Sequence, residues 1–352
     1  MTPRLTPRLT PRPTGRTARI RLTTALSLAT TLVVALLGLA AGSASYSLAE
    51  IAGVLAGFGS PADQLVLIEF RAPRVAAGLA VGASLGLAGA LTQTFARNPL
   101  ATPDILGVTS GASLGAVAAI CLGGGTYAVA APLLALGLPA AAAVGALAAA
   151  VVVYGLAWRG GVDSYRLILI GIGATAALGG VTNYLVARAQ ITDASAAAQW
   201  MVGNLAGVSW VSVWPVVVVL ALVWPFAAAQ SRALDVSQLG DDLASGLGVD
   251  LNRHRFAVLG CAVALTAAAV AASGPVEFAA FVSPQIALRL AAAARPPLAA
   301  SALVGACLVT GADALARGPL PGDTPVGIIT AIIGAPYLLW LLIRHRPGQE
   351  AL

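Results

Sequence analysis

The chain has 352 residues, of which 58% are hydrophobic and only 10% are charged. A soluble domain carries about 25% charged residues, so this composition excludes a water-soluble globular protein and indicates a chain embedded in a lipid bilayer. The net charge of +6 comes from arginine, because the sequence contains no lysine. Without lysine the chain cannot form the P-loop GxxxxGK[ST], so it does not itself bind ATP through that motif.

The N-terminal segment is strongly basic. Six arginines and a Thr-Pro-Arg-Leu repetition precede the first apolar run, a pattern that suits no packed core. We expect residues 1–21 to form a disordered cytoplasmic tail; nothing else in the chain supports the alternative of nucleic-acid binding. The apolar run Leu22–Gly42 resembles a signal peptide, but it is longer than a usual h-region and many spans follow. An uncleaved first span is therefore the better interpretation.

Apolar runs divided by Gly, Pro and charged clusters predict an all-α membrane protein, since about 20 apolar residues cross a bilayer. Ten spans are predicted, within one polytopic domain over residues 22–346 that is followed by a C-terminal tail over residues 347–352. They are Leu22–Gly42, Val75–Phe95, Ile105–Leu122, Pro139–Trp158, Leu167–Ala187, Val211–Ala229, Phe256–Ala272, Val276–Ala294, Leu298–Ala316 and Val326–Ile343.

The positions of the arginines predict the orientation. With the N-terminus in the cytoplasm, ten arginines lie in the inner loops and C-terminal segment and six in the N-terminal tail, against four on the outer side. Positive charge is retained on the cytoplasmic side of membrane proteins. We therefore expect a multi-pass membrane protein with both termini in the cytoplasm.

Two polar connections between spans predict short helices. Gln199–Leu205, between the fifth and sixth spans, is too short and too polar to cross the membrane and fits an interfacial helix on the outer face. The longest inner loop contains Asp241 and Asp242, which suit the first turn of a helix, and Gly248, which suits its end. We expect a short cytoplasmic helix there, with a positive φ at Gly248.

The sequence contains few residues of the kinds that catalysis or ion coupling requires. The cysteines and histidines stand singly, so no metal site and no bound cofactor are expected. Glu277 and Asp313 lie near the outer ends of the eighth and ninth spans, not at the midplane, where ion-driven carriers place coupling groups. A secondary transporter and a membrane-embedded enzyme remain as alternatives, but neither has its expected cluster of residues.

A series of short motifs lies along the chain. They include Arg-Ala-Pro-Arg at 71–74, Arg-Asn-Pro-Leu-Ala at 97–101, Trp-Met-Val-Gly-Asn-Leu at 200–205, Gly-Pro-Val-Glu-Phe at 274–278 and Pro-Val-Gly-Ile-Ile-Thr at 325–330. Taken in order, these motifs resemble the FecCD family of permeases from iron-siderophore, haem and vitamin B12 ABC importers, and the resemblance covers roughly Leu22 to Arg344.

This resemblance implies a permease subunit, not an enzyme, that moves a ferric siderophore across the inner membrane; vitamin B12 or haem is the alternative cargo. It implies a second permease subunit, two ATPase subunits that carry the ATP and Mg, and an extracytoplasmic substrate-binding protein. The translocation path is expected at the interface between the two permeases. Spans two to five should be related to spans seven to ten by an inverted repeat.

The resemblance also implies roles for single residues. Coupling to the ATPase would fall to the loop helix, with Gly240, Asp241, Asp242, Leu247 and Gly248. Arg97, Asn98 and Pro99 form the family motif near the inner face.

On the outer side, Arg71, Arg74 and Arg317 would dock acidic residues of the binding protein. For Arg317 a local ion pair with Asp313 remains the alternative. Pro284 and Gln285 stand where the family often has Pro-His; they favour a siderophore as substrate and are candidate pathway residues.

Overall fold

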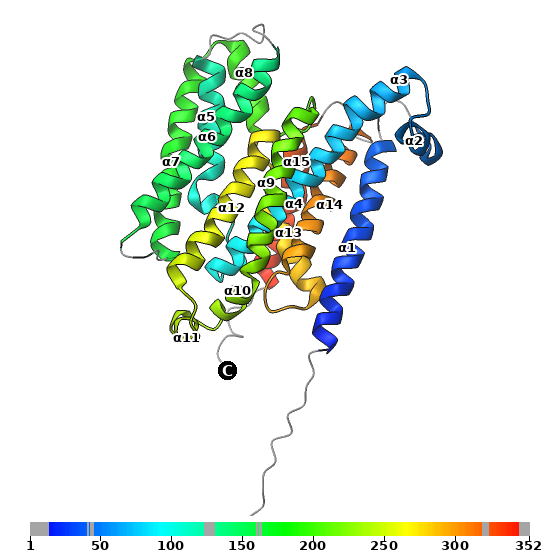
Figure 1. Cartoon of the computed structure of the whole chain (residues 1–352). Helices are drawn as coiled ribbons and strands as arrows, with labels where there is room; N and C mark the ends of the chain where they lie inside the picture. The colour runs from blue at the N-terminus through cyan, green and yellow to red at the C-terminus, as the bar shows by residue number, and fades with distance from the viewer. Residues whose placement is uncertain are drawn as a thin grey trace, which may run out of the picture.

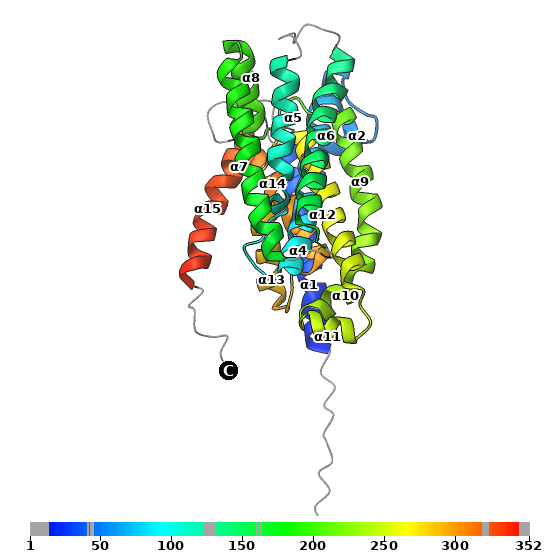
Figure 2. The same ribbon diagram turned by 90° about the vertical axis from the view of Figure 1, so that its left-hand side faces the viewer.

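The computed structural model describes residues 14–40, 42, 46–122, 131–159, 161, 164–318 and 324–344. Over these ranges the chain forms a bundle of helices that share one long axis (Figures 1 and 2). The prediction of an all-α membrane protein is confirmed, and each predicted span corresponds to one helix. These helices are α1 (Thr14–Ala40), α4 (Ala72–Ala96), α5 (Val108–Leu122), α6 (Ala131–Ala157), α7 (Ser164–Arg188), α9 (Trp210–Ala229), α12 (Leu251–Ser273), α13 (Ala279–Ala291), α14 (Leu298–Arg317) and α15 (Val326–Arg344).

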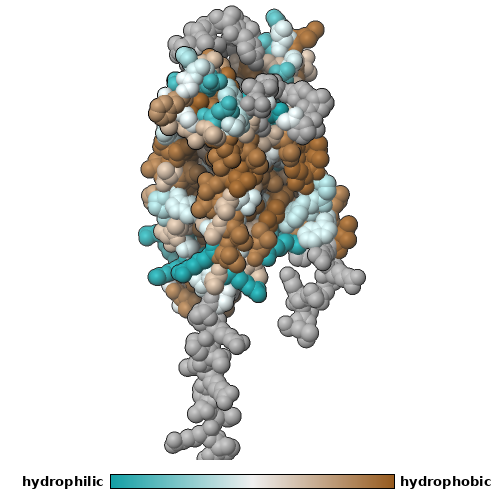
Figure 3. All heavy atoms as spheres, turned by 90° about the vertical axis from the view of Figure 1, so that its right-hand side faces the viewer, coloured by the Kyte–Doolittle hydropathy of each residue, from teal (hydrophilic) through white to brown (hydrophobic). Residues whose placement is uncertain are grey.

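The lengths and surfaces of these helices suit a bilayer. Within the described residues, seven helices are long and apolar enough to cross a membrane, whereas α5, α13 and α15 are shorter apolar helices. Figure 3 shows the face that carries α1: apolar atoms form a band across its middle, and hydrophilic atoms lie above and below the band. Lipid tails can solvate such a band, whereas water cannot.

The first helix starts earlier than the sequence predicted. It begins at Thr14, so residues 14–21 of the expected tail are helical; residues 1–13, and the tail at 347–352, lie outside the described residues. Helix α1 packs against α14, and the hydroxyl of Thr31 donates a hydrogen bond to the carbonyl of Leu303 at 3.0 Å. The first span is thus an integral part of the bundle.

Two spans are shorter than predicted because glycines and left-handed residues interrupt them. The third was expected from Ile105, but a 3-10 helix over Pro103–Leu106 ends at Gly107, with φ of +65°, before α5 begins. The eighth was expected from Val276, but the chain is not helical until Ala279, because Phe278 has φ of +62°. Apolarity alone does not reveal such breaks.

Short helices cap both ends of the bundle (Figure 1). One end, here called the α2 end, carries α2 (Leu48–Leu55), α3 (Pro61–Gln64), a π-helical segment (Leu65–Arg71) that continues into α4, and α8 (Ile191–Met201). The opposite end, the α11 end, carries α10 (Ser231–Ser237) and α11 (Asp241–Gly246). Capping boxes start α2 and α3, with Ser47–Glu50 and Ser60–Asp63 as their pairs.

The predicted interfacial helix at Gln199–Leu205 was misplaced: the helix is α8, which ends at Met201, and the motif that follows is a turn. The apolar connection 123–130 lies outside the described residues.

Helix α4 forms the centre of the bundle and packs against α12, α13 and α14. Its crossing with α14 depends on paired glycines, because a Cβ atom on Gly82 would lie 2.2 Å from the carbonyl oxygen of Gly305. Small residues allow helices in membranes to approach this closely. Helix α12 packs in turn against α4, α5 and α6. The first helix of each group, α4–α7 or α12–α15, thus contacts the second and third helices of the other group. Such symmetric contacts are what an inverted repeat predicts.

Candidate functional site

Helix α11 protrudes at one end of the bundle and has the form that the sequence predicted. Gly240, with φ of +108°, precedes it, and Asp241 and Asp242 occupy its first turn. Gly248, two residues after its last turn, has φ of +85°, so the expected positive φ is confirmed. Carboxylates in the first turn of a helix are favoured by the helix dipole.

One face of this segment is apolar although it projects from the bundle. Leu239, Leu243 and Leu247 follow at intervals of four residues and are 59%, 60% and 65% exposed. Leu243 in α11 and Leu247 at its end share one face, because residues spaced by four lie on the same face of a helix. Leu239 lies just before the helix, on the other side of Gly240. We call the three leucines the leucine stripe. Only Leu247 was singled out from the sequence, because the helical register of the loop was not known.

Two arginines fix α11 to the bundle. The Asp241 carboxylate accepts from Arg97, which ends α4, and from Arg255 in the first turns of α12. Arg97 has φ of +48° and terminates α4 in the left-handed conformation, so its backbone turns toward α11. Partial burial alone would raise the pKa of Asp241, but the hydrogen bonds and charges of Arg255 and Arg97 outweigh it and hold the pKa below its usual value.

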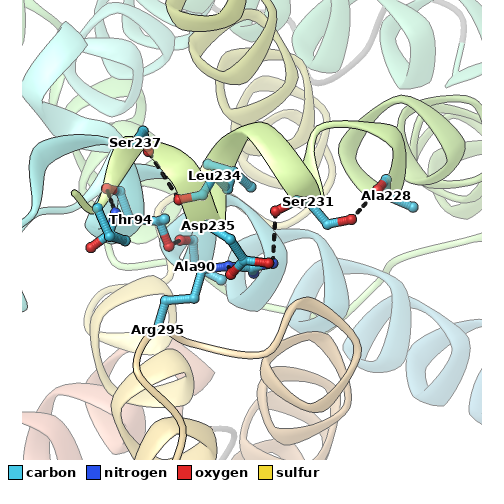
Figure 4. A network of polar contacts seen from close by, with 9 residues as sticks. Ala90, Thr94, Ala228, Ser231, Leu234, Asp235, Ser237 and Arg295 are labelled. Atoms are coloured by element: carbon cyan, nitrogen blue, oxygen red, sulfur yellow. Dashed lines mark hydrogen bonds and ion pairs between the residues drawn. The ribbon is translucent and has the colours of Figure 1, made fainter. Parts of the chain in front are cut away.

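Helix α10 is held in the same way (Figure 4). The Arg295 guanidinium, from the connection between α13 and α14, binds both carboxylate oxygens of Asp235 at 2.5 and 3.2 Å and the carbonyl of Ser231 at 3.0 Å. The Gln238 amide donates to the carbonyl of Thr94 in α4 at 2.9 Å. A displacement of α10 and α11 would therefore pull on α4, α12 and the α13–α14 connection together.

The motif at residues 97–99 belongs to this site. After Arg97, Asn98 forms a turn in which its side-chain oxygen accepts from the N–H of Leu100 at 2.9 Å. This turn follows the end of α4, and Arg97 extends from it to Asp241. The structure thus joins two sets of residues, the 97–99 motif and the loop helix, that the sequence could assign only separately.

Three other motif segments meet toward the α2 end. The N–H of Asn204 donates to the carbonyl of Ser273 at 2.7 Å, and that of Gly327 to the carbonyl of Gly203 at 3.1 Å. Gly203, with φ of +72°, lies so close that a Cβ atom would be 1.9 Å from the carbonyl oxygen of Pro275. The segments at 200–205, 273–276 and 325–327 form a glycine crossing, for which sequence analysis had found no role.

Of the three outer arginines, Arg71 is buried, Arg74 and Arg317 are partly buried, and all three have partners within the chain. Arg71 donates to the carbonyls of Leu39 and Ala40 at 2.8 and 3.1 Å. Arg74 and Arg317 both bind the buried carboxylate of Asp313, at 2.8 and 3.0 Å. The local pairing left open for Arg317 is therefore present. Docking of a binding protein through these three side chains, as the resemblance implied, stays a prediction.

Gln285 and Pro284 are also in the interior. The Gln285 amide donates to the side-chain oxygen of Gln93 at 2.7 Å, and Gln93 donates to the carbonyl of Phe281 at 3.0 Å. The two glutamines thus connect α4 and α13, and a role of Pro284 and Gln285 in the pathway stays a prediction. Within the described ranges, no group of three or more His, Cys, Asp or Glu side chains could hold a metal ion.

The bundle of long apolar helices, with a short helix held by ion pairs at one end, defines a polytopic membrane protein. The model of the FecCD transport family matches residues 30–344, and the chain belongs to that family. It is 37% identical to the ferric enterobactin transport system permease protein FepG of Escherichia coli (strain K12), over 88% of this chain and 91% of that protein. It is 40% identical to the cobalamin import system permease protein BtuC of Halobacterium salinarum, over 81% of this chain and 75% of that protein.

A solved structure has the same fold. It is an inward-facing conformation of a metal-chelate type ABC transporter, with a TM-score of 0.79, 25% sequence identity and coverage of 92% of this chain and 99% of that one.

Proposed function

We propose that the chain is the membrane-spanning permease subunit of an ABC importer that moves a ferric siderophore inward, driven by ATP hydrolysis on separate ATPase subunits. Family membership and the siderophore permeases among its relatives support this proposal. Vitamin B12 is the alternative cargo, because the sequence identity of this chain to a cobalamin permease is similar, at 40%. Haem is the remaining alternative from the family resemblance.

The observation that carries the proposal is the leucine stripe on a clamped helix. Exposed leucines cost free energy in water, about 25 cal/mol for each Å² left unburied. An apolar face on a segment that ion pairs hold in place fits a protein partner better than it fits lipid. An ATPase that receives Leu239, Leu243 and Leu247 could move α10 and α11, and with them α4 and α12.

The distribution of charge in the spans supports an external source of energy. Near the α2 end, Arg74 and Arg317 both pair with the buried Asp313. His254, buried in the first turns of α12 near the α11 end, is hydrogen-bonded to Gln230. Ion-driven carriers place such groups at the membrane midplane, at the substrate site. A pair of arginines bound to one carboxylate at the end of the bundle fits a structural role.

We place the α11 end in the cytoplasm because most of the arginines lie there. A second permease subunit would pack against α7 and α15. Helix α7 exposes Thr175 and Asn183 within its span, and an amide that faces lipid tails without a partner is unfavourable. The substrate-binding protein would meet the α2 end, where the three outer arginines contribute by holding α1, α4 and α14 together.

Cysteine labelling tests the orientation. In a chain freed of Cys121, Cys261 and Cys307, we expect Ser195→Cys in α8 to react with an impermeant reagent added to spheroplasts. Ser245→Cys in α11 should react only after permeabilisation. Both serines are exposed. The opposite pattern would invert the proposed topology.

The leucine stripe is tested by the assembly of the transporter. Leu243→Asp should abolish copurification of the ATPase encoded with this chain, while the variant permease remains in the membrane at the normal level. Asp242→Ala, on the same helix outside the stripe, should retain the ATPase. Full retention of the ATPase by Leu243→Asp would remove the stripe from the contact.

A further inference from the structure

Two grooves flank the first half of α1 at the α11 end, and they differ in charge. The first, of about 670 Å³, lies between α1, α9, α10 and the α13–α14 connection. It contains Arg295, whose charge is neutralised by Asp235. The second, of about 610 Å³, lies between α1, α13 and α14, and it contains Arg19 and Arg289 but no carboxylate.

The second groove, which we call the α1–α13 groove, is apolar along its depth. Its walls are formed by Leu22, Leu26, Ile286, Leu290, Val304 and Leu308. Leu22, Leu26 and Leu290 are 59%, 59% and 63% exposed, so the chain itself does not cover them. A groove of this volume with mostly apolar walls fits an acyl chain better than a soluble ligand.

The two arginines lie at the end of the groove where headgroups would be. Arg19 is in the first turns of α1, and Arg289 is in the last turn of α13. The Arg289 guanidinium also lies over the ring of Trp340 in α15, 4.6 Å from its centroid. Tryptophan and arginine together are typical of the headgroup region. Among the described residues, neither arginine forms an ion pair with a carboxylate.

We propose that the α1–α13 groove binds an anionic phospholipid, with its phosphate between Arg19 and Arg289 and one acyl chain along the apolar wall. Two cations without a counter-charge favour an anionic headgroup over a zwitterionic one, because each arginine near a membrane surface adds attraction for negative lipids. The bound lipid would pack between α1 and α13, next to α14, and so fix the position of α1. Lipid binding in this groove requires only that the chain spans a bilayer and does not depend on which substrate is transported.

Native mass spectrometry of the purified chain in detergent tests the proposal. Phosphatidylglycerol or phosphatidylcholine is added at increasing concentration, and the occupancy of one tightly retained lipid is measured. We expect a clear preference for phosphatidylglycerol and a loss of about fivefold in its affinity with Arg19→Gln. The double variant with Arg289→Gln should lose about 25-fold, because the effects of the two charges multiply. Arg21→Gln removes an exposed arginine that does not line the groove and should leave the preference unchanged.

A steric variant tests the groove independently of charge. Cys307 lines the groove in α14, and Cys307→Phe should exclude the acyl chain and lower the retention of both lipids, while the protein elutes as a single folded species. Equal affinity for the two lipids in the wild-type chain would overturn the proposal. So would equal effects of Arg19→Gln and Arg21→Gln, or normal lipid retention by Cys307→Phe.

Discussion

The guanidinium of Arg97 donates a hydrogen bond to Oδ1 of Asp241, although 144 residues separate the two in the sequence. Arg255 binds the other carboxylate oxygen of Asp241 at 2.5 Å. One aspartate thus connects the end of α4, the start of α12 and the helix that carries the leucine stripe. This arrangement makes Asp241 the residue through which movement of α11 reaches the core of the bundle.

Removal of the charge on Asp241 should weaken that connection. Asp241→Asn retains the shape of the side chain but loses both ion pairs, so we expect ATP-driven transport to fall several-fold while ATP hydrolysis continues. The ratio of transport to hydrolysis in proteoliposomes measures this. Asp242→Asn is the matched control, because Asp242 forms no ion pair within the described part of the chain. Equal ratios in the two variants would show that the cluster does not transmit movement.

The same cluster predicts a flat pH response above acidic pH. The hydrogen bonds and charges of Arg255 and Arg97 outweigh burial and lower the folded-state pKa of Asp241 below its ordinary value of 3.8. The stability from these pairs is therefore fully present above that ordinary value and is lost as the pH falls through the lowered pKa. Coupling in the wild-type chain should not change between about pH 5 and 8 through Asp241. A loss of coupling near pH 6 that Asp241→Asn removes would contradict this.

Gly248 should be sensitive to any side chain because of its backbone and not because of its surroundings. It has φ of +85°, and a Cβ atom there would meet nothing within 4 Å. Gly248→Ala should cost about 1 kcal/mol in the loop and lower the transport-to-hydrolysis ratio; Gly248→Trp should uncouple the two more fully. Gly246→Ala, in the helix and equally open, is the control. Normal coupling in Gly248→Trp would exclude a role for this turn.

The glycine crossing gives a test of packing with a close control. Gly203 and Gly207 have similar φ values, +72° and +75°, but a Cβ atom on Gly203 would lie 1.9 Å from the carbonyl oxygen of Pro275, whereas one on Gly207 would meet nothing within 4 Å. Gly203→Ala should therefore destabilise the purified protein by about 1–3 kcal/mol more than Gly207→Ala. Thermal unfolding in detergent measures the difference. Equal losses would mean that only the backbone conformation matters at both positions.

Asp313 should be essential for the stability of the α2 end. Its side chain is 1% exposed and binds Arg74 and Arg317, so Asp313→Asn would leave two partly buried arginines without their counter-charge. The expected loss is about 3 kcal/mol or more, measured by thermal unfolding in the absence of any binding protein. Arg188→Gln, an exposed arginine at the same end, should have little effect. If Asp313→Asn were stable and only failed to dock a binding protein, the cluster would serve docking and not stability.

The sequence predicted the fold well because the signal for a span is strong and local. All ten apolar runs became helices, and the arginines of the described residues lie at the end of the bundle that the predicted alternation of spans gives them. The breaks at Gly107 and Phe278 were missed, because apolar residues continue through them and only the backbone conformation changes. The short helices α2, α3 and α10 were missed because they are too brief for a periodic pattern.

Single-residue roles were harder to predict than elements. Asp241 and Gly248 were assigned correctly to a short capped helix, because carboxylates and glycine have clear preferences at helix ends. For Arg74 and Arg317 the resemblance implied docking, and the sequence could not show that both also bind one buried carboxylate, that of Asp313. The link from Arg97 to Asp241 was not foreseen for the same reason: it joins segments that only the folded bundle brings together.

We propose that this chain moves a ferric chelate with energy from ATP on its partners and not from an ion gradient. The most direct test is uptake of radioactive iron, as its siderophore complex, into right-side-out vesicles from cells that express the complete transporter and are loaded with an ATP-regenerating system. We predict that uptake continues after a protonophore and valinomycin have collapsed the ion gradients, and that vanadate or Leu243→Asp abolishes it. Uptake that the ionophores abolish while ATP is maintained, or that vanadate does not affect, would contradict the account.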